Sequence, residues 1–96
     1  MAKQALDELV QRIAQRWDCK PLDLHVTAPL NLCPRLAKLA TVFGIVYGLF
    51  RDRVAEREFL RRHQDLLGGS VLDGLLSTNE HKFDAAFGLV MYLSNN

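Results

Sequence analysis

The sequence predicts an all-α protein, a compact bundle of about five or six helices packed around a central apolar helix. Apolar residues recur at spacings of three and four in most segments, which is the periodicity of one face of a helix. No segment shows the alternation of apolar and polar residues that is typical of a half-buried strand. The chain has 96 residues, 49% of them hydrophobic and 24% charged, so we expect a single domain, residues 1–96, with one core.

The N-terminal helix is predicted by five apolar residues spaced three or four apart: Leu6, Leu9, Val10, Ile13 and Trp17. Pro21 cannot continue a helix, so this one is expected to end near residues 18–20. All three prolines lie in residues 21–34, for which we expect a short helical turn opened by Pro21 and then an irregular connection. Asn31 is the expected N-cap of the next helix, with Pro34 in its first turn.

The next helix, about residues 34–52, is apolar on almost all of its faces. Such a helix is either central to its fold or covered by another chain. Its apolar run is shorter than the roughly 20 residues that a membrane span needs. Gly44 and Gly48 share one face, and we interpret them as a place where another helix packs closely. Because this helix has more apolar surface than a short chain readily covers, we also expect a homodimer.

Residues 53–66 are predicted to form a basic helix that ends at Gly68-Gly69, because glycine readily adopts the left-handed conformation found at helix C-termini. Its apolar residues are expected to pack inward: Val54, Phe59, Leu60 and Leu66. Acidic residues alternate with arginines at its start, which predicts a solvated, self-paired face: Arg51, Asp52, Arg53, Glu56, Arg57 and Glu58.

Two further helices are expected after the glycines. Ser70 is the predicted N-cap of a short helix over residues 71–76, which folds back onto the core. Ser77 and Glu80 have the spacing of a capping box for the last helix. The inward stripe of that helix is predicted from helical spacing: Phe83, Ala86, Phe87, Val90, Met91 and Ser94.

The residues that catalysis or metal binding requires do not occur at the necessary spacings. The three histidines lie in three different segments, and His25 is predicted to be a partly buried, satisfied imidazole. Cys19 and Cys33 are fourteen residues apart without a CxxC pair, which predicts two buried free thiols. Cys33 beside Pro34 has the alternative of a reactive thiol at a helix N-terminus, but no partner base is visible. We therefore expect no enzyme activity, no metal and no cofactor.

The charged N-terminus contains no apolar segment like that of a secretory signal, so we expect a cytoplasmic protein that contacts no membrane. Twelve basic and eleven acidic residues leave a net charge of +1, which argues against a large phosphate-contacting surface. Five arginines nevertheless lie within twelve residues, and Arg61-Arg62 have no adjacent acid. They form either a solubilising surface or a contact with a protein or a nucleic acid.

Several short motifs between Arg35 and Leu93 occur in one order: Leu49-Phe50 with Asp52, then Phe59-Leu60-Arg61-Arg62, then Leu67-Gly68-Gly69-Ser70 with Leu72, Asp73, Leu75 and Leu76, and finally Tyr92-Leu93. In this order they resemble the toxin-binding domain of the Xre/MbcA/ParS antitoxin family. The chain departs from that pattern in four ways. Phe59 stands where the family favours tryptophan, His63-Gln64 replace Pro-Asn, Val71 occupies the proline position of the turn, and the turn is one residue shorter than in the family.

The resemblance implies an antitoxin that binds and occludes a cognate toxin enzyme, either RES-type and NAD-consuming or ADP-ribosylating, and that forms a homodimer. It implies a structural turn at Gly68, Gly69, Ser70 and Asp73. The candidate partner-binding residues are those before the turn and at the C-terminus: Arg61, Arg62, Tyr92, Ser94, Asn95 and Asn96, the last three being expected to project beyond the final helix.

Two alternatives remain open at this point. One is a small dimeric DNA-binding regulator, although residues 1–34 offer only one helix and a proline-rich connection, too little for a helix-turn-helix. The other is an adaptor protein of phage or plasmid origin that has no enzyme partner.

Overall fold

The computed structural model describes residues 2–27 and 33–95, with side chains from Glu8 onward in the first helix. Its elements follow one another in this order: α1 (Ala2–Trp17), the 3-10 helix η1 (Pro21–Leu24), α2 (Pro34–Phe50), α3 (Arg53–Arg61), β1 (His63–Gln64), β2 (Gly69–Ser70), α4 (Val71–Leu75) and α5 (Glu80–Ser94). The predicted all-α fold is confirmed, with a two-stranded hairpin added between α3 and α4.

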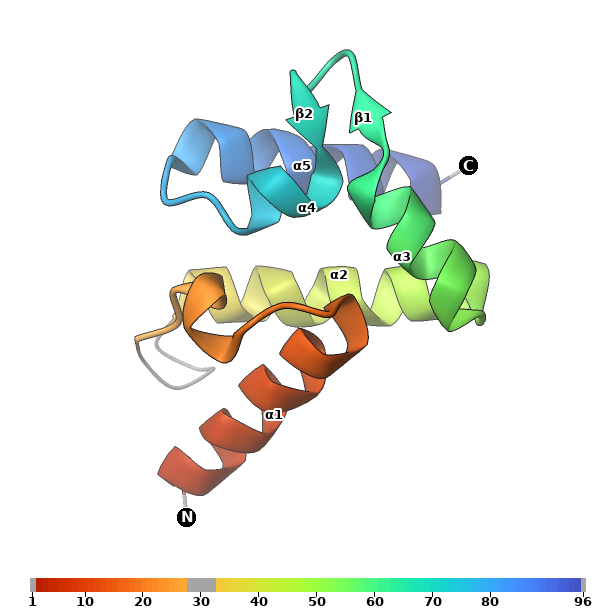
Figure 1. Ribbon diagram of the computed structural model, residues 1–96. Helices are drawn as coiled ribbons and strands as arrows, with labels where there is room; N and C mark the ends of the chain where they lie inside the picture. The colour runs from red at the N-terminus through yellow and green to blue at the C-terminus, as the bar shows by residue number, and fades with distance from the viewer. Residues whose placement is uncertain (1, 28–32, 96) are drawn as a thin grey trace.

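α2 crosses the middle of the molecule, with α1 on one side and α4 and α5 on the other (Figure 1). Its inward residues are completely or almost completely buried: Leu36, Leu39, Val42 and Val46. They meet the buried residues of the other helices, among them Ile13 and Trp17 of α1 and Leu60 of α3. Each fully buried aliphatic side chain stabilises the fold by about 1.5–3 kcal/mol. Because α2 contributes several of them, it is the core helix that its composition predicts.

The junction between α1 and α2 follows local sequence rules. Asp18 adopts a left-handed conformation (φ 58°) directly after α1, and Pro21 opens η1 as predicted. Cys33, whose Sγ accepts a 3.4 Å hydrogen bond from the Leu36 N–H, is the N-cap of α2. Asn31, the predicted cap, lies outside the described residues. His25 is exposed at the end of η1, so the prediction that it is partly buried was wrong.

Arg35 connects three elements of the fold. Its guanidinium donates to the carbonyl oxygens of Leu24 in η1, at 2.7 Å, and of Leu75 in α4, at 2.5 Å. It also lies over the ring of Phe83 in α5, with Cζ 4.4 Å from the ring centroid. Burial lowers the pKa of Arg35, because the charged form is less well solvated there. The guanidinium thus joins η1, α4 and α5 to the first turn of α2.

α2 ends at Phe50 because Arg51 is left-handed (φ 56°) and its N–H bonds to the carbonyl oxygen of Tyr47. The helix is therefore two residues shorter than predicted. Gly44 and Gly48 are exposed, and a Cβ added at either would meet nothing within 4 Å. The prediction that another helix of this fold packs closely against these glycines was wrong, because their face of α2 points away from the core.

The segment after α3 differs most from the sequence prediction. The helix expected over residues 53–66 ends at Arg61, and β1 then pairs antiparallel with β2. Gly68, at φ 68°, lies in the turn between the strands, and its N–H bonds to the carbonyl oxygen of Gln64 at 3.0 Å. The glycines therefore turn a hairpin and do not terminate the basic helix. Strands of two residues are too short to show an alternating pattern, so the sequence contained no sign of them.

α4 begins in the hairpin itself. Ser70 is its N-cap, as predicted, and forms a capping box with Asp73: the Asp73 N–H donates to Ser70 Oγ at 3.0 Å, and the Ser70 N–H to Asp73 Oδ2 at 3.2 Å. Gly74 lies so close to α5 that an added Cβ would be 2.7 Å from the Cβ of Ala86. The capping box fixes the direction of α4, and Gly74 permits its contact with α5.

α5 begins two residues later than the predicted capping box places it, so the prediction of Ser77 as its N-cap was wrong. Asn79 is the N-cap, and its Oδ1 accepts from the N–H groups of His81 and Lys82, whereas Ser77 Oγ accepts from the Asn79 N–H. Three of the six predicted stripe residues are buried: Phe83, Ala86 and Val90. Phe87 and Met91 are half-buried and Ser94 is exposed, because the core side of α5 is narrower than the predicted stripe.

Candidate protein-binding surface

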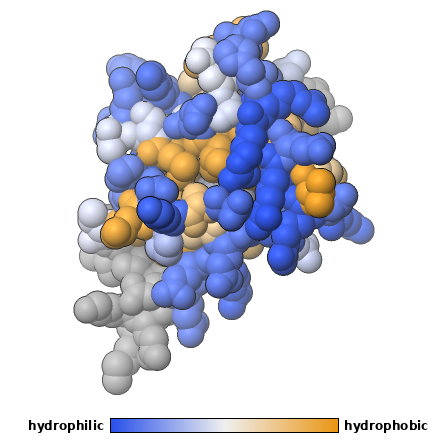
Figure 2. Space-filling view, viewed as in Figure 1, coloured by the Kyte–Doolittle hydropathy of each residue, from blue (hydrophilic) through white to orange (hydrophobic). Residues whose placement is uncertain are grey.

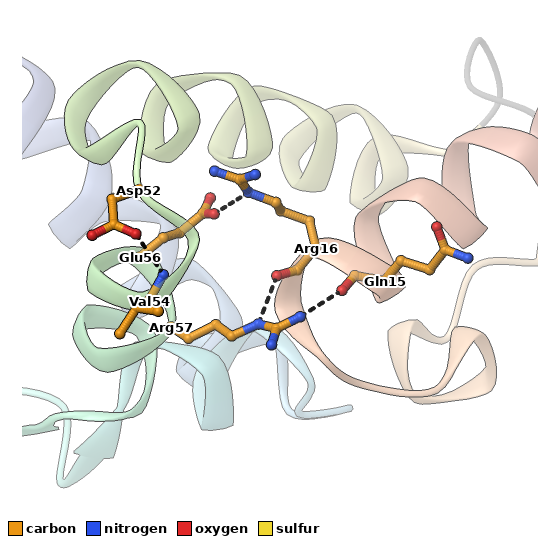
Figure 3. Close-up of polar contacts among 6 residues, drawn as sticks. All are labelled: Gln15, Arg16, Asp52, Val54, Glu56 and Arg57. Atoms are coloured by element: carbon orange, nitrogen blue, oxygen red, sulfur yellow. Dashed lines mark hydrogen bonds and ion pairs between the residues drawn. The ribbon is translucent and has the colours of Figure 1, made fainter.

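Two arginines of α3 bind the C-terminus of α1. Arg57 donates to the carbonyl oxygens of Gln15 and Arg16, at 3.1 and 3.3 Å (Figure 3). Arg61 donates through Nη2 to the carbonyl oxygens of Trp17 and Asp18, at 2.8 and 3.1 Å. The last carbonyls of a helix lack partners within the helix, and cations are favoured at that end. These two arginines therefore hold α1 against α3.

The arginine run of the sequence is thereby divided. Arg61 and Arg62, the two predicted partner contacts, are both exposed, but the Arg61 guanidinium also bonds to the end of α1. The surface over α3 remains strongly hydrophilic, with apolar surface beside it (Figure 2). Val54, expected to pack inward, is 64% exposed on this helix. Both arginines are exposed, and among the described residues Arg61 has intramolecular hydrogen-bond partners for its side chain whereas Arg62 has none.

The sequence predicted that Glu56 lies on a solvated face. That prediction was wrong, because Glu56 is completely buried. It accepts a hydrogen bond on Oε2 from Nε of Arg16, and the two side chains point toward each other across the α1–α3 junction (Figure 3). The Arg16 guanidinium lies over the ring of Tyr47, with Cζ 5.0 Å from the centroid. Glu56 Oε1 and Arg16 Nη2 are buried without a partner among the described residues. A buried carboxylate with this single charged partner depends strongly on it.

The C-terminal residues predicted to contact a partner lie on the end of α5. Tyr92 is 66% exposed. Ser94 is the last helical residue and its hydroxyl donates to the carbonyl oxygen of Met91 at 2.8 Å. Asn95 is the C-cap, with its N–H bonded to the carbonyls of Met91 and Tyr92. Ser94 and Asn95 therefore do not project as a tail, which corrects the prediction, and Asn96 lies outside the described residues.

An apolar groove of about 460 Å³ lies between the hairpin turn and α5. We call it the hairpin groove, and its walls come from five residues: Leu66, Leu67, Ala85, Leu89 and Tyr92. Leu66, which the sequence analysis placed inside a helix, is 90% exposed. Scattered exposed apolar residues are ordinary, but several around one concave surface mark an interaction site. The groove also contains Tyr92, the predicted contact that combines an apolar ring with a polar tip.

Local structure brings the two walls of the hairpin groove into position. Ala85, Leu89 and Tyr92 are spaced four and three apart, which places them on one face of α5. Leu66 and Leu67 lie in the hairpin turn, where the Leu67 N–H bonds to the carbonyl oxygen of Gln64 at 3.0 Å. The sequence does contain a signal for this groove that was not recognised, namely the two leucines directly before Gly68-Gly69. A tight turn at the glycines exposes these side chains, whereas a helix would bury them.

The described residues contain no group of three or more His, Cys, Asp or Glu side chains that could hold a metal ion. Both cysteines are free; Cys33 is buried and Cys19 half-buried. Burial raises the pKa of the Cys19 thiol, and the negative charge of Asp23 raises it further. Among the described residues, no helix is both long enough and apolar enough to cross a bilayer.

Comparison of the chain with protein-family models, curated proteins and solved structures gave no match.

Proposed function

We propose that this protein is an antitoxin-like inhibitor that binds a cognate toxin enzyme, RES-type and NAD-consuming or ADP-ribosylating, and occludes its active site. The observation that carries the proposal is the hairpin groove. Its turn is built from Leu67-Gly68-Gly69, the motif that resembles the family, and this turn leaves Leu66 90% exposed. The motif therefore produces a surface suited to protein binding in addition to a bend in the chain.

The hairpin turn is rigid enough to act as an anchor. The N–H groups of Leu67 and Gly68 both bond to the carbonyl oxygen of Gln64, and the Ser70–Asp73 capping box follows at once. Burying one exposed leucine side chain contributes about 1.5–3 kcal/mol. Since the turn is ordered before binding, little of that free energy is lost to ordering it.

The proposal is tested with the protein and a RES-type toxin of the same host, by measuring the rate of NAD⁺ consumption against inhibitor concentration. We expect stoichiometric inhibition by the wild type. Leu66→Asp places a charge in the apolar interface and is expected to weaken inhibition by about tenfold or more. Val54→Asp is the matched control, because Val54 is also an exposed apolar residue, 64% exposed, but lies on α3 outside the groove.

Circular dichroism of each variant establishes that it is folded. Failure of the folded wild type to inhibit the toxin would refute the proposed function. Equal loss of inhibition in Leu66→Asp and Val54→Asp would remove the hairpin groove as the contact surface.

The DNA-regulator alternative gains no support from the arginine run. Arg57 and Arg61 donate their hydrogen bonds to α1, which leaves fewer cations of this run to contact phosphates.

The homodimer remains a prediction, and light scattering tests it by measuring the molar mass of the protein in solution. The exposed Leu49 on α2 is a residue that such a dimer would cover, and the expected mass is twice the 10.9 kDa of one chain.

A further inference from the structure

A second groove, also of about 460 Å³, lies where α1, α2 and the start of α3 meet. We call it the arginine groove, and six residues line it: Arg12, Gln15, Arg16, Phe43, Tyr47 and Arg53. It shares no residue with the hairpin groove, which lies between other elements. Its walls combine three guanidinium groups with two aromatic rings.

The arginine groove carries two uncompensated positive charges. Arg16 is neutralised by its buried ion pair with Glu56. Arg12 and Arg53 have no ion-pair partner among the side chains that the structure describes. Both are exposed at the groove. Guanidinium groups bind phosphate oxygens through paired hydrogen bonds, so two free ones match the charge of a phosphate monoester, which is close to −2 at neutral pH.

The aromatic side of the groove offers a surface for a flat ring. Tyr47 is 53% exposed although the Arg16 guanidinium lies over its ring at 5.0 Å. Phe43, half-buried one helical turn earlier, lines the same groove. Nucleobases stack on exposed aromatic rings without regard to base identity. A ring stacked here would lie beside the two free arginines.

We infer that the arginine groove binds a mononucleotide, with its phosphate on Arg12 and Arg53 and its base against Tyr47 and Phe43. The volume of the groove is in the range of small-molecule pockets, about 300–1,000 Å³. An extended strand of nucleic acid would need a longer track of cations than two. This inference is independent of the proposed antitoxin function, because it uses other residues.

The test is calorimetric titration of the full chain at low salt with AMP, adenosine and inorganic phosphate. We expect saturable binding of AMP, with adenosine and phosphate each weaker by about tenfold or more, because each lacks one half of the interaction. Arg53→Gln is expected to weaken AMP binding by a similar factor. Arg62→Gln is the matched control, an exposed arginine outside the groove that leaves AMP affinity unchanged.

Three results would overturn the inference. The first is no heat and no amide chemical-shift change with millimolar AMP in the folded wild type. The second is equal binding of phosphate and AMP with equal losses in Arg53→Gln and Arg62→Gln, which is general attraction to a cationic surface. The third is salt-dependent binding of a single-stranded oligonucleotide without binding of AMP, which would assign the groove to nucleic acid.

Discussion

Arg61 donates a hydrogen bond of 2.8 Å from Nη2 to the carbonyl oxygen of Trp17, a residue 44 positions earlier in the sequence. Arg57, one helical turn before it, bonds to the carbonyls of Gln15 and Arg16 in the same way. The C-terminus of α1 is therefore held by cationic side chains of α3. Because Trp17 is completely buried, this contact also keeps the largest core side chain in place.

Arg61→Ala is expected to lower the free energy of unfolding by about 1–2 kcal/mol, because two carbonyls lose a charged donor at a helix C-terminus. Urea denaturation followed by circular dichroism measures the change. Arg62→Ala is the control, and its exposed side chain is expected to contribute less than about 0.5 kcal/mol. Equal stability of the two variants would show that Arg61 has no anchoring role.

Glu56→Gln is expected to destabilise the protein by about 3–5 kcal/mol, because it leaves the largely buried Arg16 guanidinium without its counter-charge. Glu58→Gln, on the exposed side of the same helix, is the control and is expected to change little. Replacing both partners by apolar residues, Arg16→Met with Glu56→Leu, is expected to recover much of the loss. A small effect of Glu56→Gln would mean that the pair is solvated in solution.

The glycines of α2 and α4 are expected to respond to alanine in opposite directions. At Gly74 the added Cβ would be 2.7 Å from Ala86 Cβ and 2.9 Å from the Lys82 carbonyl oxygen, so we expect a loss of about 1–3 kcal/mol. At Gly44 it would meet nothing within 4 Å, so we expect a gain of about 0.5–1 kcal/mol from helix propensity. Thermal unfolding of the two variants measures both. Destabilisation by Gly44→Ala would indicate that another chain packs on this face.

Cys19 is expected to react slowly with iodoacetamide in the native protein near pH 8, since burial and the charge of Asp23 raise the pKa of its thiol and keep it protonated. The same protein in urea is the control, and its labelling is expected to be faster. Because the pKa of the Cys19 thiol is higher in the native protein than in the unfolded one, the protonated thiol stabilises the fold. This stabilisation is complete below the ordinary pKa of 9.0 and is lost as the pH rises through the native pKa. Equal labelling rates in both states would contradict this shift.

Most of the helical elements could be predicted because their signals are local. Pro21 opens η1 shortly after α1 ends at Trp17, and the apolar character of residues 34–50 makes α2 the core helix. Ser70 and Asp73, three residues apart, cap α4 as their spacing indicates. The segment after α3 could not be predicted in this way. Its basic residues continue a helical pattern, and only the pairing of β1 with β2 converts it to a hairpin.

The sequence by itself determined the all-α class, the central helix and the start of α4 at Ser70, because spacing, composition and capping act within one element. Only the tertiary structure decided which charged residues are buried and which apolar residues are exposed. Glu56 is buried because Arg16, 40 residues away, meets it, and Leu66 is exposed because the hairpin turns it outward. Such partners lie on different elements, so no local pattern contains them.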